Sequence, residues 1–233
     1  MSIRKIIAIF KKQIKDTLKN KTVLIQFIMF PFLTIILTNA MPVSEMPENY
    51  FVTLFATMYI AMVPLTCMAA IIAEEKEKKT LRVLMMSNVK AWEYLIGVGS
   101  YILAICLLGS LVFGAVGHYQ GMKLLQFMII MLIGIVSSTL IGASIGIWSK
   151  NQMSASSLTV PVMLILSFLP MISMFNEKVA KVSKFIYSQQ IINLMNQINS
   201  SSLNQESIRI IAVNILLVVI VFIFAYKRCG LDA

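Results

Sequence analysis

One pentapeptide of this sequence matches the pattern that surrounds the nucleophilic serine of many hydrolases. Gly142-Ala-Ser144-Ile-Gly146 has the form G-x-S-x-G, which would make Ser144 the nucleophile. Such a serine needs a strained turn between a strand and a helix, together with a histidine and a carboxylate. Here the pattern lies in a helical apolar run, and the only histidine, His118, follows the preceding run at its outer end. We therefore predict no catalytic residue, and a membrane protease is disfavoured.

The sequence contains no phosphate-binding loop. Neither Lys21-Thr22 nor Lys79-Thr80 follows the glycine spacing that lets backbone amides surround a phosphate. Away from their edges, the long apolar runs carry no ionisable residue that could relay a proton or bind a cation. We expect no metal and no cofactor in this chain, and proton-coupled transport is disfavoured.

The strongest polar pattern lies between the second and third apolar runs. Glu74, Glu75 and Glu77 are predicted to continue a helix beyond the membrane. At a spacing of four residues, Glu74 would face Lys78 and Glu75 would face Lys79. The pattern predicts a charged helix end in water.

The same segment then becomes apolar. Its apolar residues form a ridge, which consists of Leu81, Val83, Leu84, Met85 and Met86. Exposed apolar residues that cluster on a polar loop mark the docking site of a partner. The alternative is a small helix that lies on the bilayer.

The composition is that of a membrane protein, because 58% of the 233 residues are apolar and only 13% are charged. The mean hydropathy of +0.84 arises from long uninterrupted runs. Six such runs lie at about Val23–Asn39, Tyr50–Ala73, Tyr94–Gly117, Leu124–Trp148, Leu158–Phe175 and Ser207–Tyr226. We predict an all-α membrane protein with six transmembrane helices in a single domain over residues 1–233.

Residues 3–20 precede the first run and have an amphipathic pattern. Five apolar residues recur at spacings of three or four, namely Ile3, Ile7, Phe10, Ile14 and Leu18. The lysines lie mostly off this stripe. We predict an interfacial helix with the stripe in lipid and the lysines among anionic head groups. A solvated basic tail is the alternative.

The net charge of +10 has an explanation in the membrane topology. Fifteen of the 20 Lys and Arg lie before the first run, in the loops 74–93 and 149–157, and at the C-terminal end. Because basic residues gather on the cytoplasmic side, both termini are expected there. No basic stretch alternates with aromatic residues that could stack on bases, so nucleic acid is not an expected partner.

Residues 176–206 form a long, semi-apolar segment on the predicted external side. Phe185, Ile191 and Leu194 are among the apolar residues at helix-compatible spacings, which predicts a re-entrant or interfacial helix. Ser202-Leu-Asn-Gln205 fits a capping box at the start of the last span.

Small residues recur along the fourth run, at Gly134, Ser138, Gly142 and Gly146. A stripe of small side chains lets another helix approach closely. The approaching helix can belong to the same subunit or to a second one.

The loop E-E-K-E-K-K-T-L-R-V-L-M-M-S-N-V, followed by a span that begins W-E-Y-L-I-G, resembles the corresponding region of ABC-2 type transporter permeases. In that family the loop commonly reads E-R/K-E-x-G-T-L-x-x-L-x-x-S/T-P-V. The amphipathic first helix and the order of the spans are similar too. Two positions depart from the pattern, because Lys79 stands at the usual Gly and Asn88 at the usual Pro.

The resemblance implies that residues 74–93 form a coupling helix that sits in a groove of a separate ATPase subunit. Leu81 and Leu84 would insert into that groove. The implied contact residues are Glu74, Glu75, Glu77, Thr80, Leu81, Leu84 and Ser87. The elbow helix, with its stripe Ile7, Phe10, Ile14 and Leu18, would contact the same subunit.

The function that the resemblance implies is ATP-driven export across the bacterial cytoplasmic membrane. The expected substrate is amphipathic, such as a drug, an antimicrobial peptide or a lipid-like molecule. Two permease chains, identical or related, would pair with ATP-binding subunits that hold ATP and Mg. The alternative is a secondary transporter or channel subunit not driven by ATP, which the lack of intramembrane charges disfavours.

Overall fold

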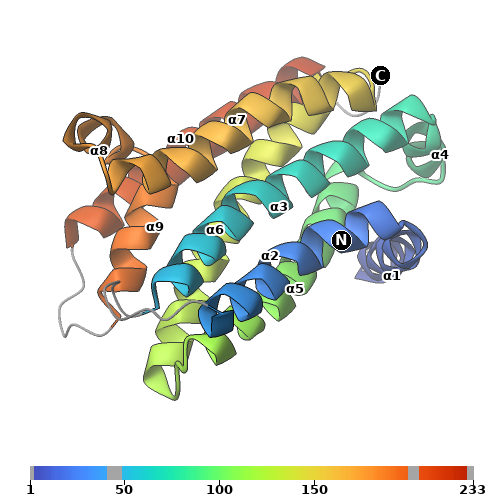
Figure 1. The fold of residues 1–233 in the computed structure, drawn as a ribbon. Coiled ribbons are helices and arrows are strands. Elements are labelled where there is room, and N and C mark those ends of the chain that lie inside the picture. The colour runs from blue at the N-terminus through green and yellow to red at the C-terminus, as the bar shows by residue number, and fades with distance from the viewer. Residues whose placement is uncertain (1–2, 41–48, 199–204, 230–233) are drawn as a thin grey trace.

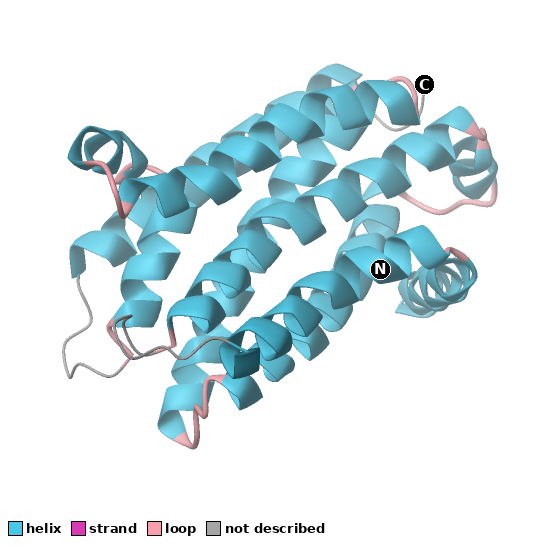
Figure 2. Cartoon of the chain, viewed as in Figure 1, coloured by secondary structure: helices cyan, strands magenta, loops and turns pink. Residues whose placement is uncertain are grey.

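The computed structural model describes residues 3–40, 49–198 and 205–229, and these residues form ten helices and no strand (Figures 1 and 2). The predicted all-α class is confirmed. The helices are α1 (Ile3–Lys19), α2 (Lys21–Ala40), α3 (Tyr50–Glu77), α4 (Thr80–Met86), α5 (Ala91–Val116), α6 (Met122–Trp148), α7 (Gln152–Ser173), α8 (Glu177–Ser183), α9 (Tyr187–Asn196) and α10 (Gln205–Cys229).

Six of the described helices are long and apolar enough to cross a membrane, namely α2, α3, α5, α6, α7 and α10. They correspond to the six predicted runs, but some extend further. The helix α3 continues to Glu77 instead of Ala73, and α7 begins at Gln152 instead of Leu158. Apolar runs mark only the part of a helix that suits lipid, so they do not show how far its polar ends continue. The start of α7 is fixed by Asn151, whose side chain accepts a hydrogen bond of 2.8 Å from the amide of Ser154.

The helix α3 lies at the centre of the bundle (Figure 1). It contacts α2, α5, α6 and α7, and its contact with α6 is the most extensive in the molecule. In its most apolar stretch 72% of the residues are buried, against 11% in α10 at the periphery. A displacement of α3 would therefore disturb most of the other helices.

The small residues of α6 allow its close contact with α3. A Cβ atom on Gly142 would collide with the backbone carbonyl of Leu65, and one on Gly134 would lie 2.6 Å from Cδ1 of Ile60. The hydroxyl of Ser138 donates to the carbonyl of Ile60. This stripe thus packs against a helix of its own chain, which is one of the two uses that the sequence left open.

The two ends of the bundle carry different short helices (Figure 1). The helices α1 and α4 and the C-terminal end of α10 lie at one end, whereas α8 and α9 lie at the other. The predicted segment 176–206 contains these last two helices, and most residues of α9 are buried. The side chain of Tyr187 in α9 reaches Ser138, with 2.6 Å between the hydroxyls. Ser202, the predicted cap of α10, lies outside the described residues.

The contact between α3 and α6 is tested by Gly142→Ala. Because the new methyl group would meet backbone atoms that cannot rotate away, we expect a loss of about 1–3 kcal/mol in the free energy of unfolding. The matched control is Gly99→Ala in α5, where nothing lies within 4 Å of the added Cβ atom. That change should stabilise by about 0.5–1 kcal/mol through helix propensity. Thermal unfolding in detergent measures both, and equal effects would contradict the packing argument.

Candidate functional site

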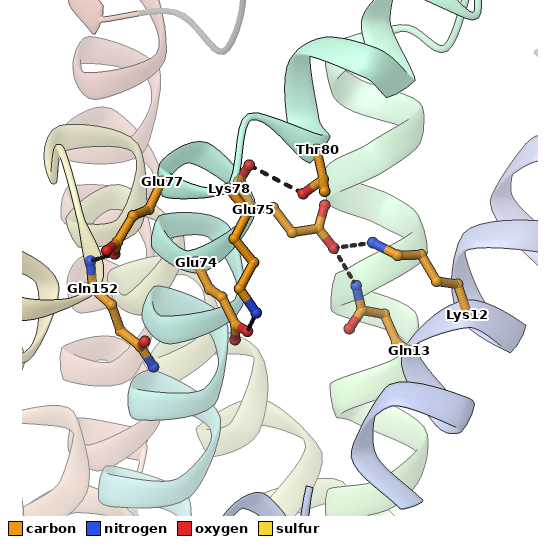
Figure 3. Close-up of polar contacts among 8 residues, drawn as sticks. All are labelled: Lys12, Gln13, Glu74, Glu75, Glu77, Lys78, Thr80 and Gln152. Carbon is orange, nitrogen blue, oxygen red and sulfur yellow. Dashed lines mark hydrogen bonds and ion pairs between the residues drawn. The ribbon is translucent and has the colours of Figure 1, made fainter. Parts of the chain in front are cut away.

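The predicted site residues lie at the end of the bundle where α3 leaves the apolar region. Four consecutive charged residues end the helix, namely Glu74, Glu75, Lys76 and Glu77. We call these four residues the charged end of α3. Figure 3 shows that the three glutamates point toward different parts of the molecule.

Glu75 joins α3 to α1. Its Oε1 accepts hydrogen bonds from Nζ of Lys12 at 2.5 Å and from Nε2 of Gln13 at 2.8 Å. The Glu75 side chain is only 9% exposed, so these charge-assisted bonds offset the cost of removing the carboxylate from water. The prediction that Glu75 faces Lys79 is wrong. The helix ends at Glu77, and Lys79 has left-handed backbone angles with φ 57°, so it no longer lies one turn beyond Glu75.

Glu74 forms the predicted local ion pair. Nζ of Lys78 lies 2.5 Å from Oε1 of Glu74, as expected for residues four apart. The hydrogen bond to Glu74 raises the pKa of Lys78. The Lys78 side chain is 65% exposed and that of Glu74 is 35% exposed, so water screens this pair and it contributes little to stability.

Lys76 and Glu77 bind the ends of two other helices. Nζ of Lys76 donates to the carbonyl of Ile147 at 2.7 Å, near the C-terminal end of α6. Oε2 of Glu77 accepts from the amide of Gln152 at 2.9 Å, in the first turn of α7 (Figure 3). A cation at a helix C-terminus and an anion at an N-terminus are both favourable. Sequence reasoning missed Lys76, because a contact between helix ends leaves no spacing pattern.

The helix α4 presents a different face from the one predicted. Leu81 is 2% exposed and packs in the core, and Leu84 is half-buried. The prediction that Leu81 projects from the loop is therefore wrong. The exposed apolar side chains are Val83, at 61%, and Met86, at 80%. Because a helix has 3.6 residues per turn, Val83 and Met86 lie on the face of α4 opposite to the buried Leu81 and point away from the bundle.

Thr80 and Ser87 stabilise the ends of α4. The hydroxyl of Thr80 donates to the carbonyl of Glu75 at 3.1 Å, and that of Ser87 donates to the carbonyl of Val83 at 3.0 Å. In this chain both side chains thus have a local role in holding α4 against the end of α3.

Both departures from the family pattern lie at turns with positive φ. Lys79, with φ 57°, joins α3 to α4 at the position where the family commonly has Gly, the residue that adopts this conformation without strain. Asn88 has φ 61° and its amide donates to the carbonyl of Met85. Proline cannot adopt that φ and has no amide hydrogen to donate, so it could not form the turn that ends α4 here.

The helix α1 has one face buried against the bundle and another that is exposed and apolar. Ile9, Gln13 and Thr17 are buried against the bundle, and a Cβ atom on Gly97 of α5 would lie 2.8 Å from Cβ of Ile9. Most of the predicted stripe lies on the other face, where Ile7, Ile14 and Leu18 are exposed, whereas Phe10 is half-buried against Tyr101. An exposed apolar stripe beside the spans suits the predicted contact with lipid.

The hydrolase pattern lies inside a regular helix. The hydroxyl of Ser144 donates to the carbonyl of Leu140 at 2.9 Å, one turn earlier in α6. His118 precedes the start of α6, so roughly 30 Å of helix separates it from Ser144. Within the residues that the structure describes, no three His, Cys, Asp or Glu side chains are grouped as metal ligands.

The contact between α1 and α3 is tested by Glu75→Ala. Removing the buried carboxylate leaves Lys12 and Gln13 without their partner, so the free energy of opening α1 should fall by about 1–2 kcal/mol. Amide hydrogen exchange of residues 3–19 in detergent measures this directly. The matched control is Glu74→Ala, which removes only the exposed pair and should change exchange in α1 little. Equal acceleration in both variants would contradict the assignment.

Comparison with known proteins agrees with this architecture. The model of the ABC-2 family transporter proteins matches residues 6–227, which include most of α1 and nearly all of α10. No match is found among curated proteins. Six apolar helices and the family indicate a multi-pass membrane protein, and the family implies partnership with an ATP-binding subunit. The chain therefore belongs to the ABC-2 family of transporter permeases.

Proposed function

We propose that this chain is the permease subunit of an ATP-driven exporter and that α4 is the element which the ATP-binding subunit contacts. The observation that carries the proposal is the exposed apolar pair Val83 and Met86 on a short helix outside the spans. Apolar side chains in such a position are stabilised when a partner's groove covers them. Their anchored neighbour Leu81 keeps α4 attached to α3.

Movement of α4 would reach the spans through the charged end of α3. The ATP-binding subunits would hold ATP and Mg and supply the chemistry of hydrolysis, whereas this chain supplies only mechanical coupling. Because the charged end bonds to α1, α6 and α7, a shift of α4 would displace several helices together. Two arrangements of these helices, open to opposite sides, would then exchange during each cycle.

A cavity between α2, α3 and α7 supports the proposal that the substrate is amphipathic. It has a volume of about 340 Å³ and combines flexible apolar side chains with polar groups. The lining residues include Met29, Met62 and Met163 and the polar Gln26, Thr66 and Ser156. A drug, an antimicrobial peptide or a lipid-like molecule has this mixed chemistry, and resistance profiling of a deletion strain against cationic peptides and hydrophobic drugs would separate these classes.

We further propose that the exporter contains two permease chains, identical or related, in a bacterial cytoplasmic membrane. A single chain lines the cavity with three helices only, and a second chain facing it would complete an enclosed path. Both termini would lie in the cytoplasm, on the side of α4, where the ATP-binding subunits are.

The coupling role is tested by replacing Val83 and Met86 together with Asp. Each fully buried apolar side chain contributes about 1.5–3 kcal/mol, so even partial burial predicts at least roughly tenfold weaker association with the ATP-binding subunit. Co-purification and substrate-stimulated ATP hydrolysis measure this loss, while expression in the membrane should stay normal. The matched control replaces Val182 and Met122 with Asp. These residues lie at the opposite end of the bundle and are 63% and 69% exposed. Normal association and export in the α4 variant would contradict the role of α4 as the contact with the ATP-binding subunit, whereas export without any associated ATP-binding subunit would favour a transporter not driven by ATP.

The orientation is tested by labelling single cysteines in intact cells. In a background without Cys67, Cys106 and Cys229, Val182→Cys in α8 should react with a membrane-impermeant maleimide, and Ser87→Cys at the end of α4 should react only after lysis. Both positions are exposed, so access and not burial decides the outcome. The reverse labelling pattern would overturn the placement of α4 in the cytoplasm.

A further inference from the structure

Two prolines inside the spans lie in helices that line the proposed substrate cavity. Pro64 is in α3 and Pro170 is in α7. A proline has no amide hydrogen, so each one leaves the helix carbonyl four residues earlier without its usual partner. These two carbonyls belong to Ile60 and Leu166. In apolar surroundings a carbonyl without a hydrogen bond is costly, so another part of the chain has to supply a donor.

The start of α9 is connected to both carbonyls. The hydroxyl of Ser188 donates directly to the Leu166 carbonyl at 2.6 Å. The Ile60 carbonyl accepts from Ser138 of α6, whose hydroxyl lies 2.6 Å from that of Tyr187. Because the single hydrogen of the Ser138 hydroxyl goes to Ile60, Tyr187 donates to Ser138. Two consecutive residues of α9 thus reach both of the carbonyls that the prolines free.

The hydroxyls of this network are buried. Ser138 and Ser188 are 0% exposed and Tyr187 is 2% exposed. One turn further along α9, Ile191 packs against the same part of the bundle, because a Cβ atom on Gly134 would lie 2.7 Å from Cδ1 of Ile191. Water therefore cannot replace these hydroxyls while α9 stays in place.

The two carbonyls lie just beyond one end of the cavity between α2, α3 and α7. On α3 the lining residues fall within 62–70, and Ile60 lies two residues before the first of them. On α7 they fall within 152–163, and Leu166 lies three residues after the last. Both carbonyls are on the side of α8 and α9, away from α4 (Figure 1). The helix α9 therefore connects two walls of the cavity at the end that is remote from α4.

We propose that α9 is the gate that closes the cavity on the external side, and that Tyr187 and Ser188 are the positioning residues that keep it closed. This inference rests on the proposed function, because it takes the cavity as the transport path. A movement that starts at α4 is carried along α3 and α6 to Ser138, where it would break the bond to Tyr187. Water that enters from outside would then replace the hydroxyls of α9, which gives the gate two arrangements.

The experiment measures access to the cavity from outside intact cells. Met163→Cys, in the cysteine-free background, places one thiol on the cavity wall. We expect slow reaction with a membrane-impermeant maleimide while the gate is closed, relative to Val182→Cys in α8. Tyr187→Phe and Ser188→Ala together remove two hydroxyls only, and the loss of each hydrogen bond should raise the labelling rate roughly fivefold.

The matched control removes two other buried hydroxyls, with Ser110→Ala and Ser144→Ala. Each of these serines donates to a carbonyl one turn earlier in its own helix, so neither bond reaches α9. The labelling rate at the cavity thiol should therefore stay unchanged. An equal increase in the control and in the α9 variant would overturn the gate.

A second variant tests the role of the proline. Pro170→Ala restores the amide hydrogen, so α7 can bond its own Leu166 carbonyl. Ser188→Ala should then raise the labelling rate in the wild-type background but little in the Pro170→Ala background. The same increase in both backgrounds would show that the freed carbonyl does not hold α9, and would overturn this mechanism of closure.

Failure of the gate and failure of the proposed function give different results. Unchanged labelling in the α9 variant, with normal export by the wild-type chain, would overturn the gate and leave the exporter standing. Faster labelling in the α9 variant, with no export by the wild-type chain, would support α9 as the closure of the cavity and contradict the exporter. No reaction at Val182→Cys would overturn the external placement of α9.

Discussion

A carboxylate buried at the end of the central helix constrains the rest of this structure. The Glu75 carboxylate is removed from water, which is costly without hydrogen-bond donors, and Lys12 and Gln13 of α1 supply such donors. Its neighbours Lys76 and Glu77 bond to the end of α6 and to the start of α7. These helices cannot separate from α3 without leaving charged or backbone groups unpaired. The end of α3 is therefore attached to α1, α6 and α7.

Within the apolar region the structure is held differently. Lipid gives helices little hydrophobic reason to associate, so close contact and hydrogen bonds between helices have to stabilise the bundle. The stripe of small residues on α6 supplies this contact, since Gly142 meets the backbone of Leu65 and Ser138 bonds to Ile60. The helix α3 has charge-assisted hydrogen bonds at one end and close packing along its length. It is therefore a rigid connection between α4 and the other spans.

Much of this arrangement could be predicted from local patterns. Run length predicted the six spans, because it reports directly on the thickness that a helix must cross. The pair Glu74 and Lys78 was predictable because both lie on one helix. The expected partner of Glu75 and the expected exposure of Leu81 were wrong for a related reason. Spacing gives the faces of a helix, but not where the helix stops or which face the rest of the chain covers.

The sequence by itself determined the helical class, the six apolar spans, the resemblance to the ABC-2 family and the lack of a phosphate-binding loop, since each depends on residues that are close together along the chain. Only the tertiary structure decided that Leu81 is buried while Val83 and Met86 are exposed. It also decided that Lys12 meets Glu75, 63 positions away. No local pattern encodes that contact, because it forms only when packing of α1 against the bundle brings the two residues together.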